Sequence, residues 1–345
     1  MTAPRTRRPA AADIPDAAFA AAFAACGCAD AGSAILLAVS GGPDSMVLLQ
    51  AAASWAREPG RPLLLVATID HGLRPEARRE AEAVGALAAS LGLGHAILTW
   101  DERPGRVSQE AARDARYRLL RDHARAIGAR RLATAHTADD QAETLLMRMA
   151  SGSGLAGLAG MAPESARGDI LHLRPFLGFA KADLVATCRA RGWAFVEDPS
   201  NAEPRFARVR WRRLMLPLAA EGLDARRLGR LAERLRRADR ALEAAASVAE
   251  ARLVASRPEG GLSIAFGDLL AEPEEIALRV LLRALQRGRP DVPIRLDRAE
   301  TALAALAAAH REGRRARRSL AGSVLTLTRE GMLVLDAEPS RNRGR

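Results

Sequence analysis

The chain has very little lysine, tyrosine and cysteine, and it contains no long apolar run. Lys181 is the only lysine among 52 basic residues, and Tyr117 is the only tyrosine. The three cysteines, Cys26, Cys28 and Cys188, include no C-x-x-C pair, which excludes a disulfide framework and a four-cysteine zinc site. Apolar residues make up 48% of the chain, but none of their runs reaches the roughly 20 residues that cross a bilayer. We therefore expect a protein of the reducing cytoplasm that has no membrane partner.

The N-terminus resembles a secretory signal peptide in outline, because basic residues precede an alanine-rich run. Asp13, Pro15 and Asp16 interrupt that run, so we expect a tail that leads into a first helix and not an export signal. At roughly 150 residues per domain, the length of 345 residues predicts two domains.

Short apolar runs alternate with segments of helical length in the first part of the chain. The runs cover residues 34–39, 63–69, 95–100, 131–135 and 194–196. Such alternation is typical of a parallel sheet with helices on both faces. The predicted fold class is therefore α/β, with a parallel sheet of about five strands.

Beyond residue 217 the pattern becomes mainly helical and rich in arginine. Helices are predicted over residues 223–254, 274–287 and 297–310, and a hairpin over residues 320–338. Residues 205–240 hold twelve arginines against four acidic residues, which accounts for most of the net charge of +11. This segment is either a surface for nucleic-acid phosphates or a solvated helix face with internal ion pairs.

A short polar stretch follows the first predicted strand. It consists of Ser40, Gly41, Gly42, Pro43, Asp44 and Ser45. In a parallel sheet, ligands bind beyond the carboxyl ends of the strands, where helix N-termini present free backbone N–H groups. The glycines let the backbone approach an anion, the serines offer hydroxyl groups, and proline suits the first helical turn. We interpret the stretch as a phosphate-binding loop that is neither GxxxxGK[ST] nor GxGxxG.

Asp44 indicates a metal ion at this loop. A carboxylate beside a bound phosphate is repulsive unless a cation lies between them, so Asp44 predicts Mg²⁺ bridging this residue and the phosphates. The alternative is an aspartate that only caps the following helix.

The strand, the SGGPDS loop and the helix together resemble the PP-loop ATP pyrophosphatase superfamily, whose members cleave ATP between the α- and β-phosphates. Five further stretches narrow the resemblance, namely DHGLRPEA, AARDARY, TAHTADDQAETLLMR, SGSGLAGLAGM and EDPSN. In this order and spacing they are similar to the tRNA(Ile)-lysidine synthetase family over residues 33–217. The implied organisation is a tail and first helix (1–28), a PP-loop ATP-binding domain (29–217), an arginine-rich helical tRNA-binding domain (218–338) and a disordered tail (339–345).

The resemblance implies an ATP-dependent ligase of the bacterial cytoplasm. Members of the family attach L-lysine to C2 of the wobble cytidine of tRNA(Ile) with a CAU anticodon. The reaction passes through an adenylylated cytidine and releases AMP and pyrophosphate. The implied partners are therefore ATP, Mg²⁺, L-lysine and this tRNA, and a homodimer remains open.

The resemblance also implies roles for individual residues. Asp44 and Asp140 are expected to hold the metal ion. Neighbouring helix residues point about 100° apart, so only one of Asp139 and Asp140 can face the nucleotide, and Asp140 is chosen because its place matches the acid of the family. Glu143, one turn further on, is expected to receive the lysine ammonium, although a solvated carboxylate is an equal alternative. Arg116 is expected to contact the α-phosphate or the adenylylated base.

The remaining expected contacts concern ATP and tRNA. The ATP-binding set is Ser40, Gly41, Gly42, Pro43, Asp44, Ser45 and His136. The tRNA-binding set is Arg113, Arg208, Arg212, Arg226, Arg227 and Arg230. Val209 stands where the family usually has asparagine, which puts one local polar contact in doubt. His71 and Tyr117 are expected to be structural.

Two other functions compete with this interpretation. A PP-loop tRNA thiolase needs a thiolate or an iron–sulfur cluster held by several cysteines, and the three scattered cysteines disfavour it. A nucleotide- or RNA-binding module without turnover has no need of two metal-binding acids together with Arg116. The ligase reading therefore ranks first.

Overall fold

The chain forms two compact units. The computed structural model describes residues 11–29, 32–72, 76–100, 109–197, 207–289 and 292–338. One unit comprises Met1–Ser151 and Ala159–Glu233, and the other comprises Gly152–Leu158 and Arg234–Arg345. The division falls inside helix α9 (Ala225–Leu253). The functional domain bounds expected from the sequence, with an end at residue 217, stay a prediction.

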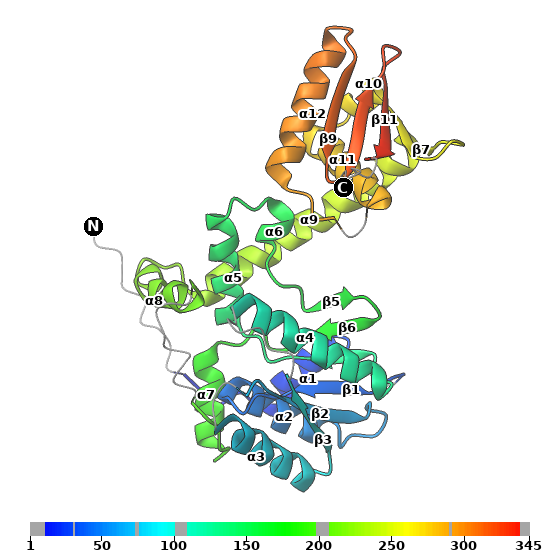
Figure 1. Cartoon of the computed structure of the whole chain (residues 1–345). Helices are drawn as coiled ribbons and strands as arrows, with labels where there is room; N and C mark the ends of the chain where they lie inside the picture. The colour runs from blue at the N-terminus through cyan, green and yellow to red at the C-terminus, as the bar shows by residue number, and fades with distance from the viewer. Residues whose placement is uncertain are drawn as a thin grey trace, which may run out of the picture. The chain divides into compact units, whose positions relative to one another are not determined.

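The first unit is built on a six-stranded sheet (Figure 1). Its strands are β1 (Ile35–Ala38), β2 (Leu64–Asp70), β3 (Gly94–Thr99), β4 (Arg131–Ala133), β5 (Glu164–Arg167) and β6 (Ile170–Leu173). The order is β3-β2-β1-β4-β6-β5, and only the edge strand β5 runs antiparallel. The expected α/β class with a largely parallel sheet is thereby confirmed.

One expected strand is wrong. Residues 194–196 form no strand, and the sheet is completed by the β5–β6 hairpin instead. The N–H of Val196 donates to the carbonyl oxygen of Gly41 at 2.9 Å, so this extended segment braces the loop after β1. In β6, His172 interrupts the apolar run, which hides the strand from a reading of hydrophobic pattern.

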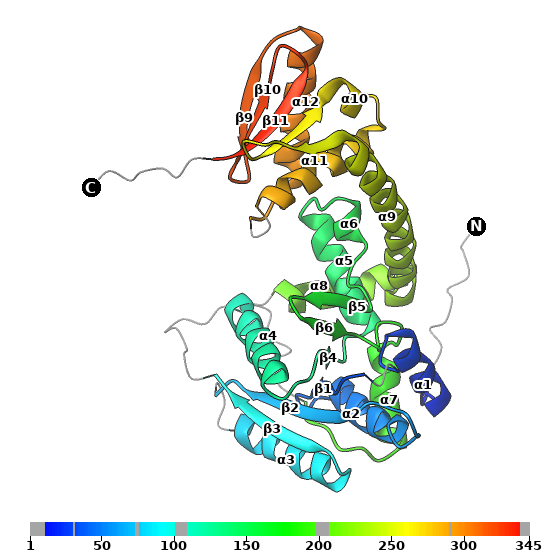
Figure 2. The same cartoon turned by 90° about the vertical axis from the view of Figure 1, so that its right-hand side faces the viewer.

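Helices cover both faces of the sheet (Figure 2). Those of the first unit are α1 (Asp16–Ala25), α2 (Pro43–Trp55), α3 (Glu76–Ser90), α4 (Gln109–Ala126), α5 (Ala138–Ala150), α7 (Lys181–Ala190) and α8 (Ala207–Ala220). Ile35 and Leu37 pack towards α1, α2, α3 and α7, whereas Leu36 packs towards α4, as strand alternation requires. Of the helices within the described ranges, none has the length and apolarity to span a membrane.

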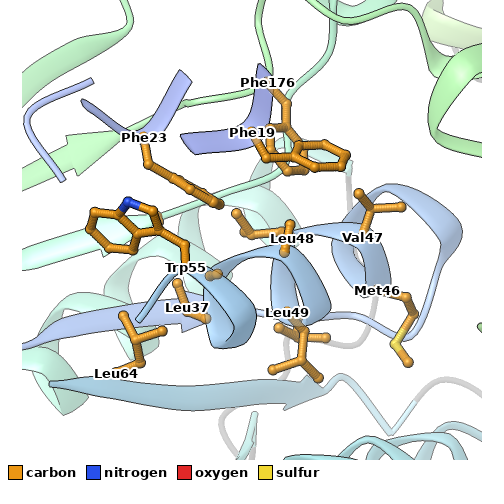
Figure 3. Packing of buried hydrophobic residues seen from close by; sticks show 14 of the residues in the cluster. Phe19, Phe23, Leu37, Met46, Val47, Leu48, Leu49, Trp55, Leu64 and Phe176 are labelled. Atoms are coloured by element: carbon orange, nitrogen blue, oxygen red, sulfur yellow. The ribbon is translucent and has the colours of Figure 1, made fainter. Parts of the chain in front are cut away.

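The larger core of the first unit joins α1 to the strand–loop–helix segment that carries the SGGPDS loop. Phe19 and Phe23 of α1 are buried against Phe176 and Trp55, with ring centroids 5.4 Å and 5.2 Å apart (Figure 3). Leu48 lies in the same cluster and belongs to α2. Burying side chains of this size stabilises a fold by about 1.5–3 kcal/mol each, so the loop rests on a rigid base.

The second unit combines helices with a small antiparallel sheet. Besides α6 (Leu155–Leu158) and the end of α9, it contains α10 (Phe266–Leu270), α11 (Glu274–Gly288) and α12 (Leu296–Arg311). The sheet order is β7 (Val254–Ser256), β8 (Leu262–Ala265), β11 (Met332–Ala337), β10 (Ser323–Leu327), β9 (Ala316–Leu320). The expected hairpin is confirmed as β10 and β11, within a larger sheet than the sequence indicated.

Buried ion pairs connect α9 and α11 in the second unit. Arg279 is buried and donates to Asp239, Glu243 and Glu275 at 2.6–2.8 Å. Arg283 donates to Glu243 and to Glu250 of α9. Asp239, Glu243 and Glu250 of α9 are therefore paired inside this unit.

Candidate active site

The order in which strands are added to the sheet reverses at β1, and this reversal marks the position of the candidate site. β2 and β3 lie on one side of β1, while β4 and β6 lie on the other. In open α/β sheets, the crevice beyond the carboxyl ends of two such diverging strands is the usual ligand position. The loop after β1 contains SGGPDS, and the loop after β4 contains His136 and leads into Asp139 and Asp140 at the start of α5. The two acidic segments expected to share a metal ion thus emerge from neighbouring parallel strands.

The SGGPDS loop is held by its own hydrogen bonds. Gly41 has φ of 84°, a conformation that favours glycine, and Gly42 is the N-cap of α2 with Pro43 in the first turn. Ser45 Oγ donates to the carbonyl oxygen of Gly42 at 2.9 Å and accepts from the N–H of Ser40 at 3.1 Å. No side chain caps the start of α2, so its first backbone N–H groups are available to an anion.

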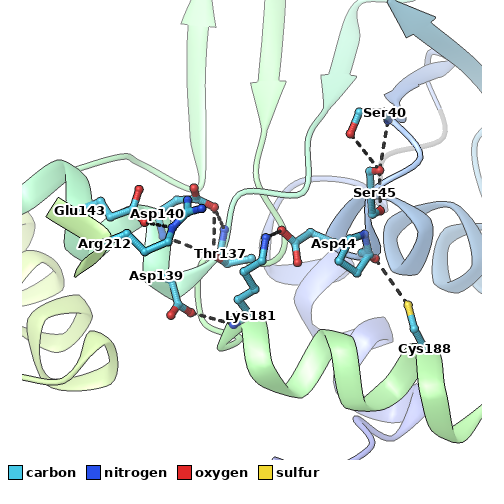
Figure 4. Close-up of polar contacts among 12 residues, drawn as sticks. Ser40, Asp44, Ser45, Thr137, Asp139, Asp140, Glu143, Lys181, Cys188 and Arg212 are labelled. Carbon is cyan, nitrogen blue, oxygen red and sulfur yellow. Dashed lines mark hydrogen bonds and ion pairs between the residues drawn. The ribbon is translucent and has the colours of Figure 1, made fainter. Parts of the chain in front are cut away.

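Asp44 lies at the start of α2 and pairs with Lys181, the first residue of α7 (Figure 4). Lys181 Nζ is 2.9 Å from Asp44 Oδ2, whereas Asp44 Oδ1 is buried and has no hydrogen-bond partner within the described part of the chain. Burial raises the pKa of Asp44, the Lys181 ammonium opposes this, and the charges of Asp140 and Asp139 add to the rise. Asp44 is therefore engaged in an ion pair within the folded chain, and its expected role as a metal ligand stays a prediction.

Lys181 was missed as a site residue by the sequence analysis. Its ammonium contacts Asp44, and its backbone N–H donates to Asp139 Oδ2 at 2.7 Å. The available signal was its status as the only lysine among 52 basic residues.

Asp139 and Asp140 point in different directions, as expected for neighbours on a helix. Asp139 contacts the start of α7, while Asp140 Oδ2 accepts from the N–H and the hydroxyl of Thr137, both at 2.9 Å, in a capping box. Asp140 Oδ1 is 4.0 Å from a guanidinium nitrogen of Arg208. Burial opposes ionisation of Asp140, but His136 and the bonds from Thr137 keep its pKa below the ordinary value. The Asp140 carboxylate is therefore kept ionised and is held in place by Thr137.

Glu143 is buried one turn further along α5. Its side chain is 2% exposed, and Oε1 accepts from Arg212 Nε of α8 at 2.8 Å. Of the residues that the structure describes, none is a hydrogen-bond partner of the buried Oε2. Burial raises the pKa of Glu143, and the bond from Arg212 opposes the rise. The alternative of a solvated carboxylate is therefore wrong, and Arg212 is engaged with Glu143.

The arginines of α4 lie near the histidines of the site. The Arg113 guanidinium carbon is 5.2 Å from the Tyr117 ring centroid, and the Tyr117 hydroxyl is 3.4 Å from His136 Nε2. Arg116 is exposed, and burial together with its charge lowers the pKa of His71 to about 4. Arg113, Arg116 and His136 thus gather beside the loops that follow β2 and β4.

His136 belongs to a row of hydrogen-bonded side chains. Thr134 Oγ1 lies 2.7 Å from His136 Nδ1 and 2.8 Å from His172 Nε2. His172 Nδ1 lies 2.8 Å from an Arg174 guanidinium nitrogen. Burial lowers the pKa of His136 to about 4, and burial with the Arg174 charge lowers that of His172 to about 2. Both imidazoles are neutral at physiological pH.

The remaining expected tRNA contacts lie on α8 and α9. Arg208 is half-buried beside Asp140, and Arg226, Arg227 and Arg230 are exposed. Val209 is 8% exposed, so this departure from the family pattern is an apolar packing position. The expected stretches at residues 70–77 and 197–201 fall partly outside the described residues.

Comparison with known proteins identifies the fold family. A PP-loop domain family matches residues 16–219. A solved U34-tRNA thiolase from Methanococcus maripaludis superposes with a TM-score of 0.55 at 15% identity, covering 64% of this chain and 77% of the thiolase. At that identity the likeness shows the fold alone.

Curated relatives identify the family more narrowly. A tRNA(Ile)-lysidine synthase from Methylobacterium nodulans is 53% identical over 320 residues, which cover 91% of this chain and 93% of the relative. A second one, from a Bradyrhizobium species, is 48% identical over 334 residues and covers 92% and 93%. The SGGPDS loop follows β1, and Asp139 and Asp140 at the start of α5 follow the adjacent strand β4. With this PP-loop fold and these relatives, the chain belongs to the tRNA(Ile)-lysidine synthase family.

Proposed function

We propose that this protein attaches L-lysine to C2 of the wobble cytidine of tRNA(Ile) with a CAU anticodon, using ATP and releasing AMP and pyrophosphate. The observation that carries the proposal is the pair of carboxylates, Asp44 and Asp140, at the loops of the adjacent strands β1 and β4. Each carboxylate raises the electrostatic cost of the other, so the arrangement suits a reaction that brings a cation and a polyphosphate.

The triphosphate of ATP is proposed to bind at the SGGPDS loop. The N-terminus of α2 offers free N–H groups and a partial positive charge, and Gly41 and Gly42 leave room for a close approach of phosphate. Ser40, Pro43 and Ser45 hold the turn, and His136 lies in the loop after the neighbouring strand β4.

Mg²⁺ fits the residues that are present. Asp44 Oδ1 is buried without a partner among the described residues, and the Lys181 ammonium on Oδ2 supports the proposal that this carboxylate binds a cation. Hard oxygen ligands from one or two carboxylates, completed by phosphate oxygens, are the usual Mg²⁺ environment. Asp44 and Asp140 would hold the ion, which supplies positive charge beside the phosphates when bound.

The first chemical step is proposed to be adenylylation of the cytidine. The O2 atom of cytosine attacks the α-phosphorus, a new O–P bond forms, and the bond to the β-phosphate oxygen breaks to release pyrophosphate. Cytosine O2 is a weak nucleophile, so the attack depends on stabilising the negative charge that develops on the oxygens around the α-phosphorus. Arg116 and Arg113 on α4 provide exposed guanidinium groups near the β4 loop for this purpose.

In the second step, the ε-amine of lysine attacks C2 and AMP leaves. The amine is an ammonium with pKa of about 10.4 in water, so a base must take its proton first. Glu143 has a free buried oxygen, Oε2, and burial raises its pKa, which makes it a better proton acceptor than an exposed glutamate. Glu143 is our candidate to bind the ammonium.

The tRNA is proposed to be bound by arginines on α8 and α9. Arg208 lies half-buried beside Asp140, and Arg226, Arg227 and Arg230 lie exposed further along the chain. Arg212 contributes through its bond to Glu143. Since such tRNAs are made and used in the bacterial cytoplasm, we propose that location, with no membrane partner; a homodimer stays open.

A thiolase activity is disfavoured by the position of the cysteines. Cys26, Cys28 and Cys188 are all buried. Burial raises the pKa of Cys188 to about 11, and its thiol donates to the carbonyl oxygen of Pro43. No group of three or more cysteine, histidine or acidic side chains suited to a resident metal occurs among the described residues.

The proposal is tested by incubating the protein with Mg²⁺, ATP, labelled lysine and tRNA(Ile). We expect AMP and pyrophosphate to be released and lysine to enter the tRNA. Asp44→Ala, Asp140→Ala and Arg116→Ala should abolish turnover, while Cys188→Ala should retain it. Release of ADP, or full activity of Asp140→Ala, would overturn the assignment.

A further inference from the structure

Four side chains form a hydrogen-bonded row from the buried interior to the candidate site. Arg174 and His172 lie at the end of β6, and Thr134 and His136 follow β4. Arg174, His172 and Thr134 are buried, while His136 is half-buried. The contacts are Arg174 to His172 Nδ1 at 2.8 Å, His172 Nε2 to Thr134 Oγ1 at 2.8 Å, and Thr134 Oγ1 to His136 Nδ1 at 2.7 Å.

The chemistry of these groups favours one direction for the hydrogen bonds of the row. Arginine only donates, so His172 Nδ1 must accept and carries no proton. The proton of neutral His172 therefore lies on Nε2 and is donated to Thr134 Oγ1. The Thr134 hydroxyl hydrogen is then directed to His136 Nδ1, which must also accept. The proton of His136 is left on Nε2, the nitrogen 3.4 Å from the Tyr117 hydroxyl.

We infer that Arg174, His172 and Thr134 act as positioning residues that hold His136 neutral with its proton on Nε2. Held in this way, His136 donates a hydrogen bond to a phosphate oxygen and cannot accept the proton of the incoming lysine amine. The role at phosphate rests on the proposed function, whereas the tautomer follows from the hydrogen bonds alone.

A different arrangement of protons is less favourable. Thr134 Oγ1 has two lone pairs and could accept from both imidazoles, with the proton of His136 on Nδ1. The Thr134 hydroxyl hydrogen would then be buried without an acceptor, because no other one is present in the described part of the chain. An unsatisfied buried polar group costs about 1–3 kcal/mol, which favours the directed row.

Surrounding charges support a neutral His136. Burial lowers its pKa to about 4, and the charges of Arg174, Arg113 and Arg208 act in the same direction, although Asp140 opposes them. A neutral imidazole donor is a known device in active sites, because it gives a hydrogen bond without a net charge. The base for lysine must then be one of the carboxylates, which strengthens the candidacy of Glu143.

The direct test is the tautomer of His136 in ring-¹⁵N-histidine protein. The chain has only six histidines, so long-range ¹H–¹⁵N spectra can be assigned with His136→Gln and His172→Gln. We expect the Nε2–H form for His136 at neutral pH, without any ligand. An Nδ1–H form or an imidazolium would overturn the inference. The measurement uses the wild-type protein, so it does not depend on whether a Thr134 variant folds.

Variants at Thr134 test whether the hydrogen-bonded row sets the tautomer of His136. Thr134→Val should abolish the tautomer preference and slow AMP release about tenfold, the equivalent of one lost hydrogen bond. Thr134→Ser should restore both. Thr187→Val removes another fully buried hydroxyl, on α7, and should leave the His136 spectrum unchanged. An unaltered tautomer in Thr134→Val would overturn this role of the row, whereas wild-type protein with the expected tautomer but no AMP release would overturn only the proposed function.

Discussion

Asp44 has two carboxylate oxygens with different surroundings. Oδ2 is bonded to Lys181, while Oδ1 is buried and has no partner in the described ranges. A buried, incompletely paired carboxylate destabilises the fold, and the raised pKa of Asp44 is the expression of that cost. Residues whose buried polar atoms lack a hydrogen-bond partner in this way tend to be functional.

The cost at Asp44 predicts a gain in stability when its charge is removed. Because the folded-state pKa is raised, this group's contribution is full below the unfolded pKa of about 3.9 and is lost as pH rises through the folded pKa. Asp44→Asn should therefore raise the free energy of unfolding at pH 7 by about 1 kcal/mol, measured by urea denaturation, while stopping AMP release. At pH 4 the gain should shrink.

A matched control is Asp169→Asn. The Asp169 carboxylate is exposed and bonded to Arg125, and this bond lowers its pKa. No gain in stability is expected from that change. A loss of stability at pH 7 in Asp44→Asn would show that the Lys181 ion pair outweighs burial.

Individual residues differ in how far they could be predicted from the sequence. Asp44 and Asp140 stand in short motifs, so their place beyond the strands follows from the local pattern. Lys181 reaches Asp44 from 137 residues away, by the packing of α7 on α2, which no local pattern encodes. The pairing of Arg212 with Glu143 is likewise tertiary.

At the scale of elements, the ion pair between Arg212 of α8 and the buried Glu143 of α5 links these two helices. Arg212→Met would leave Glu143, 2% exposed, without a counter-charge. Since removing one partner of a buried ion pair strands the other charge, we expect a loss of about 2 kcal/mol in the free energy of unfolding at pH 7, less than the full buried-pair value because Arg212 is half-exposed. Urea denaturation measures this loss.

The double variant isolates the charge effect. Arg212→Met combined with Glu143→Gln removes both charges, so most of the stability should return. If the double variant is as unstable as Arg212→Met alone, the aliphatic packing of Arg212 and not its charge holds α8 in place.

Long helices and regular strands were the most predictable elements. The expected helix at 274–287 is α11 (Glu274–Gly288), and the one at 297–310 is α12 (Leu296–Arg311), because their apolar residues repeat over several turns. The apolar run at 194–196 is too short to show a repeat of apolar and polar residues. Its backbone forms a hydrogen bond with Gly41 and not with a neighbouring strand. The β5–β6 hairpin was not predicted because its polar residues, including His172, are satisfied by tertiary hydrogen bonds.

At the scale of the whole molecule, buried neutral histidines predict acid sensitivity. The folded-state pKa of His172 is about 2 and those of His71 and His136 are about 4, all below the unfolded value of about 6.5. The folded protein therefore binds fewer protons, and stability falls as pH drops from about 6.5 towards 4, by up to about 1.4 kcal/mol per pH unit for His172. His172→Gln should flatten this slope, and an unchanged slope would contradict the account.

The distribution of charge predicts how tRNA is held. Asp239, Glu243 and Glu250 of α9 pair with arginines of α11, whereas Arg226, Arg227 and Arg230 near its start are exposed. Neutralising these three arginines to glutamine should weaken tRNA binding. It should also reduce the slope of log K against log salt by about 1 for each arginine that contacts a phosphate.

A control of equal charge comes from three other exposed arginines. Arg57 follows α2, Arg130 precedes β4, and Arg189 lies in the last turn of α7. Neutralising these should leave the salt slope unchanged. Equal slopes for the wild type and the α9 triple variant would instead support a solvated helix face.

The most direct test of the central claim is nucleoside analysis of the tRNA after reaction. We predict that tRNA(Ile) with a CAU anticodon, incubated with the protein, ATP, Mg²⁺ and lysine, is converted at the wobble cytidine to a lysine adduct, with one AMP released per lysine. Elongator methionine tRNA, which shares the anticodon letters, should remain unmodified. Sulfur at that nucleoside, or AMP release without any lysine adduct, would contradict the account.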